Sequence, residues 1–247
     1  MKLLSINQDS KTKKGVNEGF LTGIMYFAPH KISGFNVCSS ATTGCIKSCL
    51  YTAGMGVFNN VQQARINRTL FFKNDQKAFF NQLIKEITAL INKAKREHLT
   101  PVIRLNGTSD IPFENIAVIH QKKLYNNIFS LFSEVQFYDY TKIVKRLNSH
   151  NYKSCDNYLL TFSRAESNTK DCITALKSGV NVASLFNKSH PESYKINNLR
   201  YQVLNGDLTD LRFKDKTGVI IGLIAKGQAK KDNTGFVINN HLQKGVN

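Results

Sequence analysis

The sequence has no long apolar run, and its acidic residues are few for a chain of 247 residues. No apolar segment approaches the roughly 18 residues that a membrane-spanning helix needs, so no membrane partner is expected. The opening segment MKLLSINQDSKTKK contains too short an apolar stretch for a secretory signal peptide. A cytoplasmic location is therefore expected.

Acidic residues number 17 against 34 lysines and arginines, which gives a formal net charge of +17. An excess of this size attracts polyanions, so nucleic acid is a candidate partner. The basic residues are spread along the chain rather than gathered in one tract, and they would equally serve to keep the chain soluble. The charge alone leaves nucleic-acid binding open.

Cysteine is also scarce, but three of the five cysteines lie in the segment VCSSATTGCIKSCLYTAGMG, residues 37–56. Cys38, Cys45 and Cys49 are spaced C-x6-C-x3-C. An odd number of cysteines in a chain of this size argues against a secreted disulfide scaffold. In a reducing compartment, a close trio of thiols is typical of a metal, cluster or redox site.

Thiolates are soft ligands that suit both iron–sulfur clusters and zinc. Structural zinc sites usually contain paired C-x2-4-C knuckles, which this segment lacks. The serine and threonine hydroxyls of the segment would hydrogen-bond to cluster sulfides. We therefore expect Cys38, Cys45 and Cys49 to bind a 4Fe–4S cluster whose fourth iron is open to a small-molecule ligand. Zinc and an unliganded trio remain the alternatives.

Short apolar segments alternate along the chain with segments of helical periodicity. The predicted strands lie within residues 20–29, 101–110, 135–142, 158–167, 180–186, 201–213 and 218–227. The predicted helices lie within residues 59–72, 75–98, 114–132, 143–150 and 169–179. The clearest is 75–98, which has one apolar face and is capped by Asn74 or Asp75.

This alternation predicts an α/β fold, namely a single-domain (β/α) barrel, complete or partial, with mostly parallel strands. An open doubly wound sheet is the alternative. No linker or internal repeat divides the chain, so we expect one domain over residues 20–247. It would carry the cysteine loop at 37–56 and follow a polar, partly irregular segment at 1–19.

In either architecture, chemistry is expected at the carboxyl ends of the strands, where polar residues gather. The candidate ligand-binding residues are Asn106, Asp110, Asp139, Tyr140, Lys142, Ser163, Arg164, Glu166, Asp207 and Lys226. No P-loop, serine-hydrolase or HExxH signature occurs, and no residue is assigned a catalytic role. Strands commonly end in polar loops, which is the plainer explanation of the pattern.

The cysteine loop, followed by ARINRTL, VIRLNGTSD, FYDYTK, GDLTDLRF and GLIAKGQAKKDNTGFVI, resembles the bacteriophage gene product eighty-eight family over residues 36–238. The resemblance implies a phage-encoded protein in the host cytoplasm, with an iron–sulfur site. A three-cysteine loop after the first strand also resembles radical S-adenosylmethionine enzymes, which implies S-adenosylmethionine as a cofactor. The spacing differs from their C-x3-C-x2-C, and Ser48 stands where they have an aromatic residue.

Three functions follow from these observations. The first is an iron–sulfur protein that binds a small molecule, as an S-adenosylmethionine-dependent enzyme if the second resemblance holds. The alternative is a basic nucleic-acid-binding phage replication protein in which the cysteines hold a structural metal. A redox or regulatory binding module without catalysis is the third.

Overall fold

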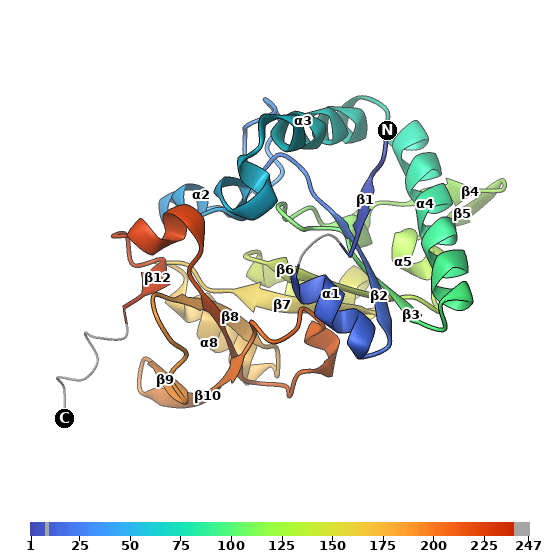
Figure 1. Cartoon of the computed structure of the whole chain (residues 1–247). Coiled ribbons are helices and arrows are strands. Elements are labelled where there is room, and N and C mark those ends of the chain that lie inside the picture. Colours follow the sequence, from blue (N-terminus) through green and yellow to red (C-terminus); the bar gives the residue numbers. More distant parts are fainter. Residues whose placement is uncertain (8–9, 240–247) are drawn as a thin grey trace.

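The computed structural model describes residues 1–7 and 10–239 and contains a mixed ten-stranded sheet together with a separate two-stranded one (Figure 1). The strands are β1 (Leu4–Ile6), β2 (Phe20–Met25), β3 (Thr100–Arg104), β4 (Val118–His120), β5 (Lys123–Tyr125), β6 (Gln136–Thr141), β7 (Tyr158–Ser163), β8 (Val182–Phe186), β9 (Ser193–Ile196), β10 (Leu199–Asn205), β11 (Ile220–Ile224) and β12 (Val237–Ile238). Residues 240–247, at the end of the predicted domain, lie outside the described residues.

Helices connect most of these strands. The α-helices are α1 (Ser10–Asn17), α2 (Thr43–Lys47), α3 (Asn59–Asn74), α4 (Gln76–Arg96), α5 (Ile128–Leu131), α6 (Val144–Leu147), α7 (His150–Lys153) and α8 (Thr169–Lys177). Short 3-10 helices are η1 (Leu50–Thr52), η2 (Gly54–Val57), η3 (Phe113–Asn115), η4 (Arg212–Lys214) and η5 (Gly227–Lys231). Within the described residues, none of the helices has the length and apolar character required to span a membrane.

All seven predicted strands form, and they run parallel in the order β2-β3-β6-β7-β8-β11-β10. The antiparallel strands β1 and β9 flank this array, and β12 adds to β8. The predicted (β/α) barrel, complete or partial, is wrong. Because β1 pairs with β2 alone and β9 with β10 alone, the described sheet ends at two edges and does not close.

Different elements pack on the two faces of the sheet. Gly23 faces α4, and a Cβ built on it would lie 3.0 Å from Leu90. Its neighbour Thr22 points to the opposite face, where a Cβ on Gly15 of α1 would lie 3.9 Å from the Thr22 Oγ1 and from Leu211. In Figure 1, α1 lies across this second face. The helix α1 and the segment around Leu211 thus cover the face of the sheet opposite α4.

The main core lies between the sheet and α4, whose predicted apolar face is confirmed. Its buried residues are Phe79, Phe80, Leu83, Ile84, Ile87, Leu90 and Ala94. The Asp75 side chain caps the helix by accepting a 2.9 Å hydrogen bond from the Ala78 N–H. Phe79 also packs edge-on against Phe72 of α3, with ring centres 5.1 Å apart. The core therefore fixes α3 and α4 on the same side of the sheet.

Two segments differ from the sequence predictions. The predicted helix over 114–132 is wrong, because most of it forms η3, the β4–β5 hairpin and α5. Gln121 and Lys122 turn the hairpin with φ values of 49° and 64°, which is typical of the two-residue turns that match strand twist. The segment 1–19, expected to be partly irregular, contains β1 and α1 and buries Leu3 and Leu4.

Candidate functional site at the carboxyl ends of the parallel strands

The three clustered cysteines lie on different parts of the loop that follows β2. Cys38 is in irregular backbone, Cys45 is in α2, and Cys49 caps η1. All three thiols are free and partly buried. Figure 1 shows α2 and α3 together at one end of the molecule, beside the turn that contains η5. The loop therefore places its thiols beyond the carboxyl end of β2.

Cys38 is held against the loop that follows β3. Its Sγ lies 3.7 Å from the carbonyl oxygen of Thr108, whose hydroxyl donates a 2.6 Å hydrogen bond to the Phe27 carbonyl. The Asp110 N–H donates to the Val37 carbonyl at 2.8 Å. These contacts join the start of the cysteine loop to the ends of β2 and β3.

Glu166, one of the predicted ligand contacts, is hydrogen-bonded to α2 and to the residue before it. Its carboxylate accepts hydrogen bonds of 2.7 Å from the Thr42 hydroxyl and from the Gly44 N–H. Burial raises the pKa of Glu166, but these hydrogen bonds outweigh it and leave the pKa below its ordinary value. The Thr42 hydroxyl, which we expected to face a cluster sulfide, therefore serves the loop's own structure.

The three thiols are electrostatic neighbours. Burial raises the pKa of Cys38 to about 12, and the nearby groups Cys49, Asp110 and Cys45 contribute to the rise. Burial also raises the pKa of Cys49, and Cys45 adds to that effect. Thiols with raised pKa values stay protonated at neutral pH, so binding of a metal centre would have to displace their protons.

Among the residues that the structure describes, no three His, Cys, Asp or Glu side chains are grouped so that they could hold a metal ion. The cysteines are therefore near one another without surrounding one common point.

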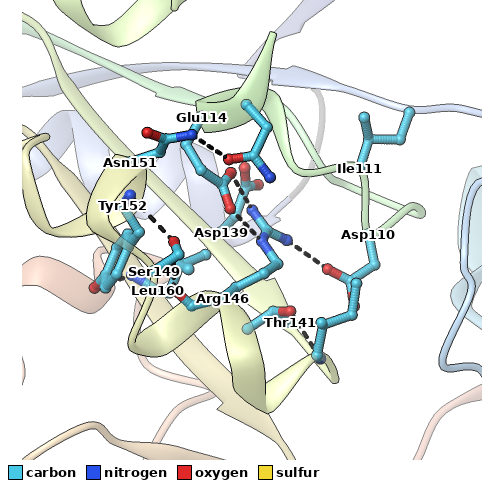
Figure 2. A network of polar contacts seen from close by, with 12 residues as sticks. Asp110, Ile111, Glu114, Asp139, Thr141, Arg146, Ser149, Asn151, Tyr152 and Leu160 are labelled. Atoms are coloured by element: carbon cyan, nitrogen blue, oxygen red, sulfur yellow. Dashed lines mark hydrogen bonds and ion pairs between the residues drawn. The ribbon is translucent and has the colours of Figure 1, made fainter.

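Arg146 is the centre of a buried polar network at the ends of β3, β6 and β7 (Figure 2). It donates to both carboxylate oxygens of Glu114, at 2.7 and 2.8 Å, and to Asp110 on its other side. It also donates at 2.9 Å to the hydroxyl of Tyr158, which in turn donates to Asp139 at 3.1 Å. Every charged group of this network has a partner within it.

Asn106 and Asp139 complete the network. The Asn106 backbone N–H and side-chain amide donate to Asp139 at 2.7 and 3.0 Å. Burial raises the pKa of Asp139 to about 6, against the opposing effects of the Arg104 charge and the Asn106 hydrogen bonds. The side chains of Asn106, Asp110 and Asp139, which are predicted ligand contacts, form hydrogen bonds that brace the loop supporting Cys38.

Tyr140 lies on the opposite face of β6 from Asp139. The guanidinium of Arg104 lies 4.5 Å from the Tyr140 ring centre and pairs with Asp210 at 3.2 Å. The Tyr138 hydroxyl donates to the same carboxylate at 2.9 Å. This second network fills the face of the sheet that α1 covers.

Lys142 and Arg164 lie near the last described segment of the chain. The ammonium of Lys142 lies 5.4 Å from the Phe236 ring centre, and Lys142 is also among the charges that act on Cys49. Arg164 donates to the carbonyls of Gly235 and Phe236 at 3.0 and 2.9 Å. Ser163 accepts through its backbone carbonyl from the Asn168 amide. Of these three candidates, Lys142 is thus the one that acts on a cysteine of the cysteine loop.

Asp207 and Lys226 form a separate charged group at the ends of β10 and β11. Asp207 lies 3.5 Å from the Lys226 ammonium and 3.0 Å from that of Lys11, and it accepts a 2.8 Å hydrogen bond from the Ile224 N–H. His190 is 3.2 Å away. These partners come from α1 and the last parallel strands rather than from the cysteine loop.

Sequence reasoning missed Arg65. The apolar positions assigned to this helix were Val61, Ala64, Ile66 and Leu70, yet the residues that α3 buries are Arg65, Thr69 and Phe72. The Arg65 guanidinium lies 4.9 Å from the ring centre of Tyr26 and 5.6 Å from that of Tyr51. Nothing in the helical pattern of ARINRTL marks Arg65 as buried.

The family model described as gene product 88 matches residues 2–240. The chain belongs to this family. The match confirms the first resemblance and extends it almost to the first residue. No curated protein and no solved structure matches the chain, so the resemblance to radical S-adenosylmethionine enzymes is not shown.

In this gene product 88 family member, the cysteine loop packs against the segment GLIAKGQAKKDNTGFVI. A Cβ on Gly44 in the cysteine loop would lie 2.3 Å from Thr234 Oγ1 and 2.6 Å from Phe236 Cβ. A Cβ on Gly227, at the other end of the second segment, would lie 2.9 Å from the Thr52 carbonyl oxygen. Glycine at both positions permits this close approach, so GLIAKGQAKKDNTGFVI helps to position the cysteine loop.

Proposed function

We propose that this gene product 88 family member is an iron–sulfur protein whose cluster is bound by Cys38, Cys45 and Cys49. The observation that carries the proposal is that three free, partly buried thiols lie close enough in one loop for the ionisation of one to affect that of another. The other two cysteines are engaged elsewhere. Cys155 contacts Asn127 and Asn151, and Cys172 contacts Asn168.

The donor set suits a cluster better than a single ion. The ligands of one zinc ion all bind the same atom, whereas cluster thiolates bind different iron atoms and lie further apart. The spacing C-x6-C-x3-C, which lacks the paired C-x2-4-C knuckles of structural zinc sites, supports this choice. With three protein thiolates, a 4Fe–4S cluster has one iron that is open to a small molecule, and S-adenosylmethionine is the first ligand to test.

When bound, such a cluster would supply electron transfer or a Lewis-acidic iron. The chain's own residues supply the surroundings. Arg65 and Lys142 both act electrostatically on Cys49 and would offset the negative charge of three bound thiolates. Glu166 and the segment around Phe236 hold α2, and hence Cys45, against the end of the sheet.

Anaerobic purification tests the proposal. The wild-type protein is expected to be brown, with a broad visible absorption band that bleaches on reduction. Cys38→Ala, Cys45→Ala and Cys49→Ala should each lose most of the colour. Cys172→Ala is the matched control, because it removes a buried thiol outside the loop, and it should keep the colour. A colourless wild-type protein after anaerobic reconstitution with iron and sulfide would refute the proposal.

Nucleic-acid binding with a structural metal is the alternative, and the net charge of +17 favours it. Such binding would weaken steeply as salt rises, because lysines and arginines that contact phosphates release counterions. A zinc-loaded, colourless protein with a steep salt dependence of DNA binding would support this alternative.

A further inference from the structure

Arg65 differs from the other buried arginines of the described chain in having no carboxylate partner. Arg146 pairs with Asp110 and Glu114, and Arg212 lies 3.3 Å from Asp215. Arg65 is only 6% exposed, yet it forms no ion pair within the described residues. Burial of a charge without a counter-charge is costly, so this arrangement calls for an explanation.

Hydrogen bonding does not compensate for the missing carboxylate. The Nε and Nη1 atoms of Arg65 are buried and have no hydrogen-bond partner in the described structure. The rings of Tyr26 and Tyr51 interact with the guanidinium charge but leave these N–H donors unused. The side chain is therefore positioned by aromatic contacts, while two of its buried nitrogen donors have no hydrogen-bond partner in the described structure.

The location of Arg65 indicates what these donors would serve. Tyr26 directly follows β2, and Tyr51 lies in η1, so the guanidinium lies between the end of the sheet and the cysteine loop. It is close enough to Cys49 for the two groups to interact electrostatically. A group bound to Arg65 would thus lie beside the cysteines.

We propose that Arg65 is an anion-binding residue that receives a carboxylate or phosphate group of a ligand through its guanidinium N–H donors. Both groups accept paired hydrogen bonds from arginine, which lysine cannot reproduce. Bound anion would supply the counter-charge and the acceptors that the chain itself does not. The proposal goes beyond the cluster and does not require one, because Arg65, Tyr26 and Tyr51 are not among the residues proposed to bind the cluster.

Calorimetric titration with inorganic phosphate and, separately, with acetate tests the proposal on the purified full-length chain. We expect the wild-type protein to bind at least one of the two anions, and Arg65→Gln to bind it at least about tenfold more weakly. Arg96→Gln, which removes the same charge from an exposed position at the end of α4, should bind like wild type. Preference for acetate identifies a carboxylate ligand, and preference for phosphate identifies a phosphoryl ligand.

Arg65→Lys guards against a folding defect, because it keeps the charge while removing the paired donors. It should melt like wild type and still bind the anion several-fold more weakly. Equal binding by wild type, Arg65→Gln and Arg65→Lys would overturn the proposal, as would a wild-type protein that binds neither anion. The binding of phosphate and acetate is measured independently of the iron content. The anion-binding role of Arg65 can therefore be tested even if the chain proves to lack a cluster.

Discussion

The carboxylate of Glu166 accepts a 2.7 Å hydrogen bond from the backbone N–H of Gly44, which lies 122 residues earlier in the chain. This bond joins the segment after β7 to the helix that carries Cys45. Because Gly44 also packs tightly on Thr234 and Phe236, two distant segments fix the position of α2. The geometry of the cysteines is therefore a property of the assembled sheet rather than of the loop alone.

Glu166→Gln should loosen this attachment. The variant keeps the size of the side chain but replaces one accepting oxygen with a donor that faces existing donors. We expect the free energy of unfolding to fall by about 1–2 kcal/mol at pH 7, measured by urea denaturation.

The effect of Glu166→Gln should also depend on pH. The folded-state pKa of Glu166 is lowered, so its stabilising contribution is present above the ordinary glutamate pKa and is lost as pH falls through the lowered value. The difference between wild type and variant should accordingly shrink towards pH 3. A difference that is the same at pH 7 and pH 3 would show that the carboxylate charge is not involved.

Gly44→Ala should displace α2 without unfolding the core. The new Cβ would lie 2.3 Å from Thr234 Oγ1, so the helix or the segment around residue 234 must shift. We expect a loss of about 1–3 kcal/mol in stability and a larger relative loss of bound iron. Gly15→Ala is the control, because its nearest neighbours would be 3.9 Å away and alanine is the better helix former. Unchanged iron content in Gly44→Ala would contradict the role given to this contact.

Arg146→Met should be strongly destabilising. It leaves the fully buried Glu114 carboxylate without its guanidinium, which costs about 3–5 kcal/mol in comparable buried pairs. Lys93→Met provides the comparison, because the Lys93 and Glu97 side chains are 41% and 46% exposed. That change should alter stability by less than about 0.5 kcal/mol in the same denaturation assay. Similar losses in both variants would refute the assignment of Arg146 as a core-bracing residue.

Protonation of the buried Asp139 carboxylate should stabilise the folded protein as pH falls below 7. Its pKa is raised from the ordinary aspartate value of 3.8 to about 6 in the folded state, so between these values the folded chain binds a proton that the unfolded chain does not. Between these two values, stability should increase by at most about 1.4 kcal/mol per pH unit as pH decreases. The increment is lost as pH rises through the folded pKa. Asp139→Asn should lack it, and an equal pH profile for both proteins would contradict the raised pKa.

The parts of the fold with local signals were predictable. The apolar periodicity and aspartate cap of α4 identify that helix, and the seven parallel strands appear as separate apolar segments. The β4–β5 hairpin was not predictable in the same way, because Gln121 and Lys122 carry no glycine or asparagine signal for a turn with positive φ. Whether the sheet closes into a barrel has no local signal either. In the open sheet, α1 and Leu211 pack onto one face through a long-range contact.

In the candidate site, too, the features with a local sequence signal were predictable and those that depend on long-range contacts were not. The cysteine grouping follows from the close spacing of Cys38, Cys45 and Cys49 in the sequence. The sequence does not reveal the roles of the polar residues at the strand ends, namely Asn106, Asp110, Asp139 and Glu166. Polar residues at such positions serve equally as ligand contacts and as braces. The partners that decide between these roles, such as Arg146 and Gly44, come from distant segments. Arg65 was hidden because a helical pattern does not distinguish a buried arginine from an exposed one.

The ratio of iron and inorganic sulfide to protein, measured on anaerobically reconstituted wild-type and Cys45→Ala chains, tests the central claim most directly. The account predicts about four irons and four sulfides per wild-type chain, and a large loss of both in the variant. A wild-type chain that holds zinc without sulfide, or iron and sulfide contents that do not change in Cys45→Ala, would contradict it.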